Sequence, residues 1–281
     1  MKKTIALLVF FFTFILCFSQ GTWTQKANFG GTGRWFATGF SIGSYGYMGT
    51  GINNTGAYQQ DFWQYDPSSD TWTTKASMPV IVGRYASAVV VDKIYVISGF
   101  NEAYASNTNL NQVYNPANNA WTFGENVPTG VLNAAAGATA GVNAPERIYV
   151  IGGWTKKPNC NNINQVYAPE SDTWTTGASM LTARARFGIA VVDDVLFAIG
   201  GVADAQLSIG GSVSATNMQY TPAQYTAPTS PSPAPSQEPI KPASTEPLQT
   251  GLLPEAWIIV AAVTAAVLGT GLLVYFRKRK R

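Results

Sequence analysis

The side chains best suited to chemistry in this chain are arginines that recur at similar intervals. Alignment on the aromatic residue of the next apolar run gives four equivalent positions, with Arg184 beside the last: Arg34, Arg84, Asn133 and Arg186. A guanidinium is a planar fork that meets a carboxylate through two hydrogen bonds, so this set is a candidate anion-binding site. Asn133 breaks the pattern. The alternative is therefore that each arginine bonds loop carbonyls and holds its own repeat together.

The composition gives catalysis little support. The chain has no histidine, which removes the commonest general base and the commonest metal ligand. Its two cysteines are Cys17 and Cys160, and Cys160 lies among asparagines in a predicted loop, where we expect an unreactive thiol. No phosphate-binding loop and no pair of nucleophile and base occurs in the sequence. We therefore predict no enzyme activity, no metal and no cofactor.

The net charge of +3 over 281 residues overstates the basic character of the chain. Seven of the 18 basic residues lie at the two ends, in Lys2-Lys3 and residues 277–281. The long stretch between them is mildly acidic. A nucleic-acid-binding domain carries a basic patch, so we predict no nucleic-acid partner.

The elements that must position these arginines repeat along the chain. A Tyr-x-Pro step begins at Tyr65, Tyr114, Tyr167 and Tyr220, and in the first three a Trp follows seven residues later. The Trp residues at positions 23, 72, 121 and 174 are separated by 49, 49 and 53 residues. Each unit contains four short β-type runs separated by turn residues. A period near 50 with four strands per unit is typical of a β-propeller, because one blade cannot bury both of its faces alone.

The order of these elements resembles the kelch-repeat family: a double glycine at Gly152-Gly153 and Gly200-Gly201, then Tyr-x-Pro, then Trp. The resemblance implies an all-β kelch-type propeller. The strand count gives four blades, over 34–72, 84–121, 133–174 and 186–222 plus 21–26, where kelch propellers more usually have six or seven. The resemblance also implies that the four aligned positions lie at one mouth of the central axis. Kelch domains that bind acidic ligands use arginines there.

Long loops after the glycines are expected on the same face, at Asn53–Gln60, Asn101–Asn109, Trp154–Asn162 and Val202–Ala215. Their exposed-aromatic candidates are Tyr58, Tyr104 and Trp154. Such loops on a rigid scaffold often carry binding residues. For Trp154, packing against a neighbouring blade is the alternative. Asn53-Asn54-Thr55 is a candidate N-glycosylation site at Asn53.

The N-terminal Gly21-Thr22-Trp23-Thr24 matches the fourth strand of a repeat, whereas the last repeat lacks one. We expect the N-terminal strand to close the ring by completing the last blade, which removes two open sheet edges. The alternative is a homodimer in which two chains exchange end strands to form an eight-bladed ring.

The flanking segments predict a single-pass membrane protein. Residues 1–19 are typical of a signal peptide, 20–222 form the propeller, and 223–254 are a Pro/Ser/Thr-rich stalk. Residues 255–276 are predicted to form a transmembrane helix, with Ala256–Phe276 in the membrane, and 277–281 a basic tail. The positive-inside rule places that tail in the cytoplasm and the propeller outside the plasma membrane.

These features favour a cell-surface binding or adhesion module whose partner is a protein or a glycan. One alternative is an extracytoplasmic carbohydrate-active enzyme that uses neither histidine nor metal. Another is a structural envelope protein. Residues 247–251 also resemble a wall-sorting signal, with the order of Pro and Leu reversed.

Overall fold

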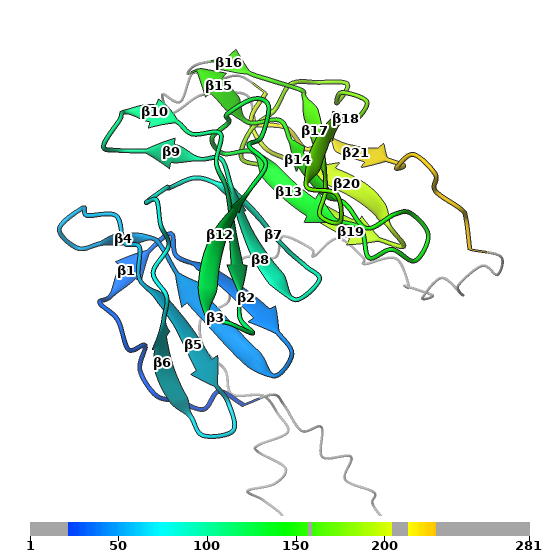
Figure 1. Ribbon diagram of the computed structural model, residues 1–281. Coiled ribbons are helices and arrows are strands. Elements are labelled where there is room, and N and C mark those ends of the chain that lie inside the picture. Colours follow the sequence, from blue (N-terminus) through cyan, green and yellow to red (C-terminus); the bar gives the residue numbers. More distant parts are fainter. Residues whose placement is uncertain (1–21, 157–158, 204–212, 229–281) are drawn as a thin grey trace, which may run out of the picture. The chain divides into compact units, whose positions relative to one another are not determined.

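The computed structural model describes residues 22–156, 159–203 and 213–228, which belong to one unit of the chain, residues 1–230. The predicted signal peptide, most of the stalk, the predicted membrane helix and the basic tail lie outside the described residues. The described part is all β-structure joined by turns and loops (Figure 1). No helix long and apolar enough to cross a membrane occurs in it.

Three four-stranded antiparallel sheets and one three-stranded sheet form the four blades. The first blade contains β2 (Thr38–Ile42), β3 (Tyr45–Gly49), β5 (Phe62–Asp66) and β6 (Thr71–Lys75). The second contains β7 (Ala86–Val90), β8 (Lys93–Ile97), β11 (Asn111–Asn115) and β12 (Ala120–Gly124). The third contains β13 (Ala135–Ala138), β14 (Ile148–Ile151), β17 (Asn164–Ala168) and β18 (Thr173–Thr176). The last contains β19 (Gly188–Val192), β20 (Val195–Ile199) and β21 (Asn217–Tyr220).

The loops after the glycines form small sheets of their own. In the first repeat β1 (Arg34–Trp35) pairs with β4 (Ile52–Asn53). In the second, β9 (Phe100–Asn101) pairs with β10 (Ser106–Asn107), and in the third β15 (Trp154–Lys156) pairs with β16 (Asn159–Cys160). Backbone hydrogen bonds within these short strand pairs therefore fix the conformation of the loops.

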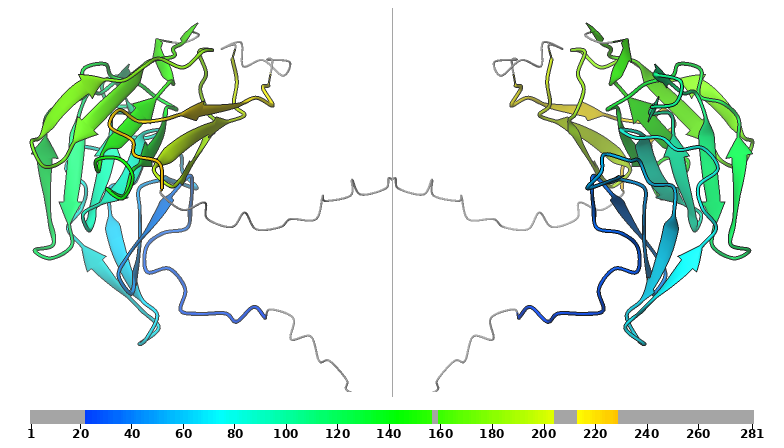
Figure 2. Two further views of the ribbon diagram at one scale, coloured as in Figure 1. Left: turned by 90° about the vertical axis from the view of Figure 1, so that its right-hand side faces the viewer. Right: turned by 90° about the vertical axis from the view of Figure 1, so that its left-hand side faces the viewer.

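The innermost strands hold successive blades together. Packing runs from β2 to β7, from β7 to β13 and from β13 to β19, and the blades follow one another in chain order (Figure 2). Because side chains alternate across a strand, Ile94 and Val96 of β8 face the first blade while Tyr95 and Ile97 face the third. This two-sided burial explains why the second strand of each repeat is an almost continuous apolar run.

A repeated contact between neighbouring blades explains the period of the Trp residues. The indole N–H of Trp121 donates to the Ala76 carbonyl oxygen at 2.8 Å, just after the fourth strand of the preceding blade. The Ala76 N–H in turn donates to Asn119 Oδ1 at 2.9 Å, and the Tyr114 hydroxyl also bonds this oxygen. Equivalent contacts join Trp174 to Glu125 and Trp72 to Ala27. We call this set the tryptophan contact.

The variant Trp121→Phe is expected to lower the free energy of unfolding by about 1–2 kcal/mol. The phenyl ring keeps the contact with Phe62 and Tyr114 but leaves the half-buried Ala76 carbonyl without its donor. Urea denaturation of the purified chain measures the change. The control is Trp35→Phe, because Trp35 is exposed and its indole makes no hydrogen bond with a described residue. Equal losses in the two variants would contradict this account.

The N-terminal strand does not take the position that the sequence predicts. Residues 22–29 form no strand, and the last blade has three strands among the described residues. Trp23 is fully exposed, because Ala27 is bonded to Asp70 and Trp72 of the first blade and holds the segment there. Packing comparable to that of the other inner strands does not join β19 back to β2. Closure of a four-bladed ring within one chain is therefore not seen.

Candidate functional site

The structure aligns a different residue of the first repeat with the arginines. Each position two residues before an inner strand has a left-handed backbone, with φ of 55°, 56°, 54° and 55° at Phe36, Arg84, Asn133 and Arg186. This conformation is uncommon outside glycine, so its recurrence identifies structurally equivalent positions. The expectation that Arg34 belongs to this set is wrong, because Arg34 lies two residues earlier. Phe36 is the equivalent residue.

Backbone hydrogen bonds link these positions from blade to blade. The Asn133 N–H donates to the Arg84 carbonyl oxygen at 2.7 Å, and the Arg186 N–H donates to the Asn133 carbonyl oxygen at 2.9 Å. The chain therefore brings three of the predicted site residues together at the start of three neighbouring inner strands. Such bonds also offset the cost of the left-handed backbone.

These residues surround a pocket of about 540 Å³. Its lining also includes Phe36, Thr38, Tyr58 and Tyr85. None of the described residues that line it carries a carboxylate, so the charged groups of the lining are the guanidinium groups of Arg84 and Arg186. A pocket of this size is within the range of ligand sites.

The two guanidinium groups are available to a ligand. Arg84 and Arg186 are exposed, and neither side chain forms a hydrogen bond or ion pair with a described residue. Each lies near an aromatic ring: Arg84 Cζ is 5.9 Å from the Phe100 centroid and Arg186 Cζ is 5.0 Å from that of Trp154. The rings pack against the two arginine side chains, and the N–H donors of both guanidinium groups remain available for hydrogen bonds to a ligand.

Asn133 also lines the pocket. Its Nδ2 atom is buried and has no hydrogen-bond partner among the described residues. A buried donor without a partner costs about 1–3 kcal/mol. Asn133 therefore belongs to the lining, although it interrupts the arginine pattern in the sequence.

Two tyrosines complete the lining. Burial raises the pKa of Tyr58, and the nearby Glu102 carboxylate raises it further. Tyr85 was not identified from the sequence; burial raises its pKa, and its hydroxyl bonds Thr38 Oγ1 at 2.7 Å and Thr50 Oγ1 at 2.6 Å. Both phenols are thus neutral near pH 7. Tyr85 follows Arg84 directly, just before β7, and this adjacency was the signal that the sequence offered.

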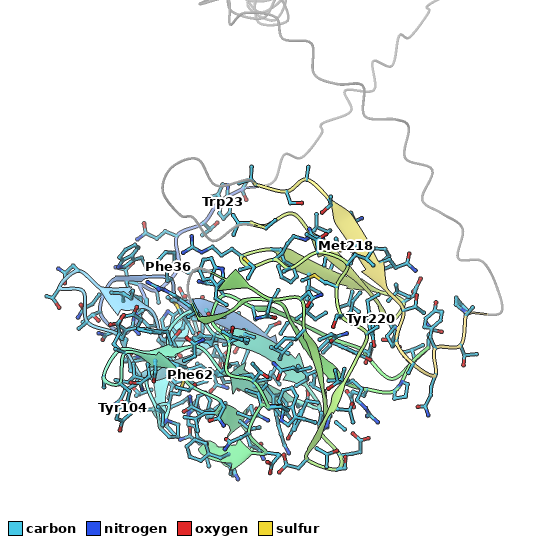
Figure 3. The ribbon with its side chains drawn as sticks, turned by 90° about the horizontal axis from the view of Figure 1, so that it is seen from above. Trp23, Phe36, Phe62, Tyr104, Met218 and Tyr220 are labelled. Carbon is cyan, nitrogen blue, oxygen red and sulfur yellow. The ribbon has the colours of Figure 1, made fainter. Side chains whose placement is uncertain are left out.

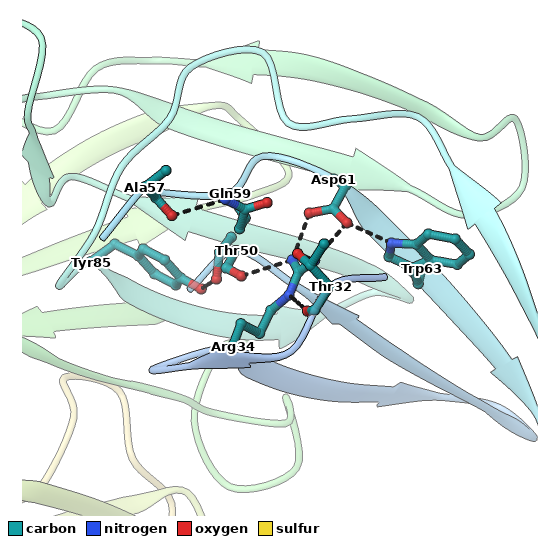
Figure 4. A network of polar contacts seen from close by, with 8 residues as sticks. All are labelled: Thr32, Arg34, Thr50, Ala57, Gln59, Asp61, Trp63 and Tyr85. Atoms are coloured by element: carbon teal, nitrogen blue, oxygen red, sulfur yellow. Dashed lines mark hydrogen bonds and ion pairs between the residues drawn. The ribbon is translucent and has the colours of Figure 1, made fainter. Parts of the chain in front are cut away.

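Arg34 and Arg184 hold loops together and do not line the pocket. The Arg34 side chain is 1% exposed; it forms a two-bonded ion pair with Asp61 at 2.5 and 2.7 Å and donates to the Thr50 carbonyl oxygen (Figure 4). Arg184 is fully buried and donates to the carbonyl oxygens of Gly200 and Thr216. For these two residues the alternative, an arginine that holds its own repeat, is the observed one.

The remaining candidates lie elsewhere. Trp154 is fully buried, packed among Leu132, Ala185 and their neighbours, so the expectation of an exposed aromatic is wrong there. Tyr104 is 77% exposed but does not line the pocket. Asn53 Oδ1 accepts hydrogen bonds from Thr55 and Ala57, and its glycosylation stays a prediction.

Known proteins match this arrangement. The Attractin/LZTR1 β-propeller family matches residues 9–222. Curated relatives include the Kelch-like protein terF of Aspergillus terreus, 28% identical over 49% of this chain and 31% of its own, and Kelch-like protein 25 of Xenopus tropicalis, 26% identical over 57% and 28%. The chain thus spans less than a third of the length of these relatives. A solved structure titled "Structure of YjhT" superposes with a TM-score of 0.55 at 20% identity, over 65% of this chain and 63% of that one.

Proposed function

Because this chain belongs to the Attractin/LZTR1 β-propeller family and is a kelch-type propeller, a kind of protein-binding module, we propose that it binds an acidic segment of a protein partner. The binding site is the pocket of Arg84, Asn133 and Arg186. The observation that carries the proposal is that two exposed guanidinium groups without partners among the described residues share one pocket whose described lining has no carboxylate. A carboxylate of the partner would meet either fork through two hydrogen bonds.

The place of action that we propose is the outer face of the plasma membrane. The support for this comes from the sequence: the leader-like residues 1–19, the Pro-rich stretch 223–254, the apolar run 256–276 and the basic residues 277–281. On this proposal the propeller is a single-pass surface module on a stalk. The carbohydrate-active enzyme and the envelope component remain the competing functions.

Binding of acidic peptides to the full chain tests the proposal. The probes are two peptides of equal length, one rich in Asp and Glu and one with the matching Asn and Gln. We expect the acidic peptide to bind, and Arg84→Gln or Arg186→Gln to weaken it about tenfold or more, since a hydrogen bond to a charged group contributes about 1.5–3 kcal/mol. Rising salt should weaken this binding as well.

The matched control is Lys93→Gln, which removes one positive charge at the far end of the first hairpin of the second blade. It should leave the affinity within about twofold. Equal binding of the acidic and amide peptides, or equal losses in all three variants, would overturn the proposal. Binding of an acidic sugar in place of the peptide would move the ligand class to glycans.

A further inference from the structure

The outer edge of the last blade is open. Strand β21 pairs with β20 along one edge, and among the described residues no strand pairs with the other. In the other three blades that edge is covered by the Trp-bearing strands β6, β12 and β18. An unpaired edge offers a row of free backbone donors and acceptors, which is a template for one more strand.

The other blades define the register of the missing strand. In each of them the Tyr of the third strand lies opposite the Trp of the fourth: Tyr65 and Trp72, Tyr114 and Trp121, Tyr167 and Trp174. The sequence Thr22-Trp23-Thr24 matches Thr71-Trp72-Thr73 and Thr173-Trp174-Thr175. The same register places Trp23 opposite Tyr220 and Thr24 opposite Gln219.

A groove of about 410 Å³ lies where the side chain of that Trp would enter. Its lining combines the third blade, through Asn164, Ala178 and Met180, with the last blade, through Met218 and Tyr220. Ala178 follows the fourth strand of the third blade, as Ala76 and Glu125 follow those before it. Its carbonyl oxygen is therefore the equivalent acceptor of the tryptophan contact. It already accepts a hydrogen bond from Asn164 Nδ2 at 3.3 Å, and its second lone pair can accept an indole N–H.

The chain's own Trp23 does not fill this groove. Figure 3 shows Trp23 apart from Met218 and Tyr220, and the indole is fully exposed. Ala27 forms with Asp70 and Trp72 of the first blade the same pair of hydrogen bonds that Ala76 forms with Asn119 and Trp121 of the second. The Phe29 ring also packs against Trp63 and Trp72. Residues 22–26 form no strand, but they lead into Ala27 at the position where the fourth strand of a blade preceding the first would end.

We propose that residues 22–26 of a second copy of this chain complete the last blade. Each copy would donate its Trp23 strand to β21 of the other, so that one interface type is used twice and the assembly is a closed dimer of eight blades. A ring of four blades must turn by about 90° per blade and one of eight by about 45°. Among the described residues β2 and β19 lack packing comparable to that of the other inner-strand pairs, which favours the wider ring. This inference is independent of the ligand pocket.

Disulfide trapping in the full chain tests the exchange. In Thr24→Cys/Gln219→Cys the two thiols would lie directly opposite, at a Cα separation of about 4.5–5.5 Å that a disulfide spans. We expect oxidation to give a covalent dimer on a non-reducing gel, with the 24–219 bond identified by mass spectrometry. The control Gln25→Cys/Gln219→Cys shifts one thiol to the other face of the strand and should trap at least tenfold less. Cys17 and Cys160 of the full chain are present in both variants, so their contributions cancel.

A trapped species with the mass of one chain would overturn the proposal in favour of closure within the chain. Trapping no greater than in the control would overturn it as well. A second measurement does not depend on added cysteines: Trp23→Ala should weaken self-association of the full chain at least tenfold, as measured by sedimentation. Unchanged self-association, or a wild-type chain that is monomeric at all concentrations, would also reject the exchange.

Discussion

Replacing Asp194 by Asn is expected to lower the free energy of unfolding by about 2–4 kcal/mol, because this carboxylate is buried and fully engaged. Oδ1 accepts the N–H of Ala140 at 2.5 Å, while Oδ2 accepts those of Val142, Asn143 and Ala144 at 2.8, 2.6 and 3.2 Å. Asn keeps the size of the side chain and tolerates the left-handed backbone at φ 62°. The Asn side chain replaces one acceptor oxygen of the carboxylate by an NH2 group. This group would face backbone N–H donors and could not accept their hydrogen bonds.

The same contact predicts a dependence on pH. Burial raises the pKa of Asp194, but the four backbone N–H groups outweigh it, so the pKa is below its usual range. A carboxyl whose folded pKa is depressed stabilises the protein above its unfolded pKa, about 3.9. This contribution is lost as the pH falls below that value toward the folded pKa. Wild-type stability should therefore fall in acid, and part of that fall should be missing in Asp194→Asn.

Urea denaturation between pH 7 and pH 3 measures both effects. The control is Asp193→Asn, because Asp193 lies in the same turn, is exposed and contributes a backbone carbonyl rather than its carboxylate. We expect a change within about 0.5 kcal/mol for the control. Equal losses for the two residues would show that the turn, and not the carboxylate, is what matters.

Asp61→Asn is expected to destabilise the first blade by about 3 kcal/mol, and more than Arg34→Met does. The asymmetry follows from burial: the Arg34 side chain is 1% exposed, whereas that of Asp61 is 30% exposed. Loss of the Asp61 carboxylate leaves the buried Arg34 guanidinium without its counter-ion. Loss of the arginine leaves an anion that water reaches and that Trp63 still bonds at 2.8 Å.

A double-mutant cycle in urea measures this pair, with Arg34→Met/Asp61→Asn as the double variant. The two single losses should sum to more than the loss in the double variant by about 2 kcal/mol. The control pair is Arg147 and Glu170, 2.7 Å apart but 26% and 59% exposed, for which Glu170→Gln should cost below about 0.5 kcal/mol. Additive losses at Arg34 and Asp61 would contradict the coupling.

The strand order of each blade was predictable from the sequence because its signals are local. Tyr and Trp of successive strands lie opposite each other, so a constant spacing of seven residues in the chain becomes a constant register in the sheet. Apolar runs such as Ile94–Ile97 reflect burial on both faces of a blade. Such patterns survive in a single sequence.

The arginines show where local patterns stop being sufficient. Arg34 and Arg84 looked equivalent when counted from the next strand, but a shift of two residues separates a buried ion pair from an exposed pocket residue. Trp154 likewise follows a glycine pair in a loop, and the burial of its ring by Leu132 and Ala185 depends on residues distant in sequence. No spacing rule contains that information.

Residue order and periodicity alone therefore specify four blades, their inner apolar strands and the register of their tryptophans, because these follow from contacts within one repeat and its neighbour. Tertiary packing was needed to show which arginines face solvent and that the edge of β21 has no partner in the described residues. Both depend on contacts between residues that are distant in the sequence, and such contacts follow only from the packing of whole sheets against each other.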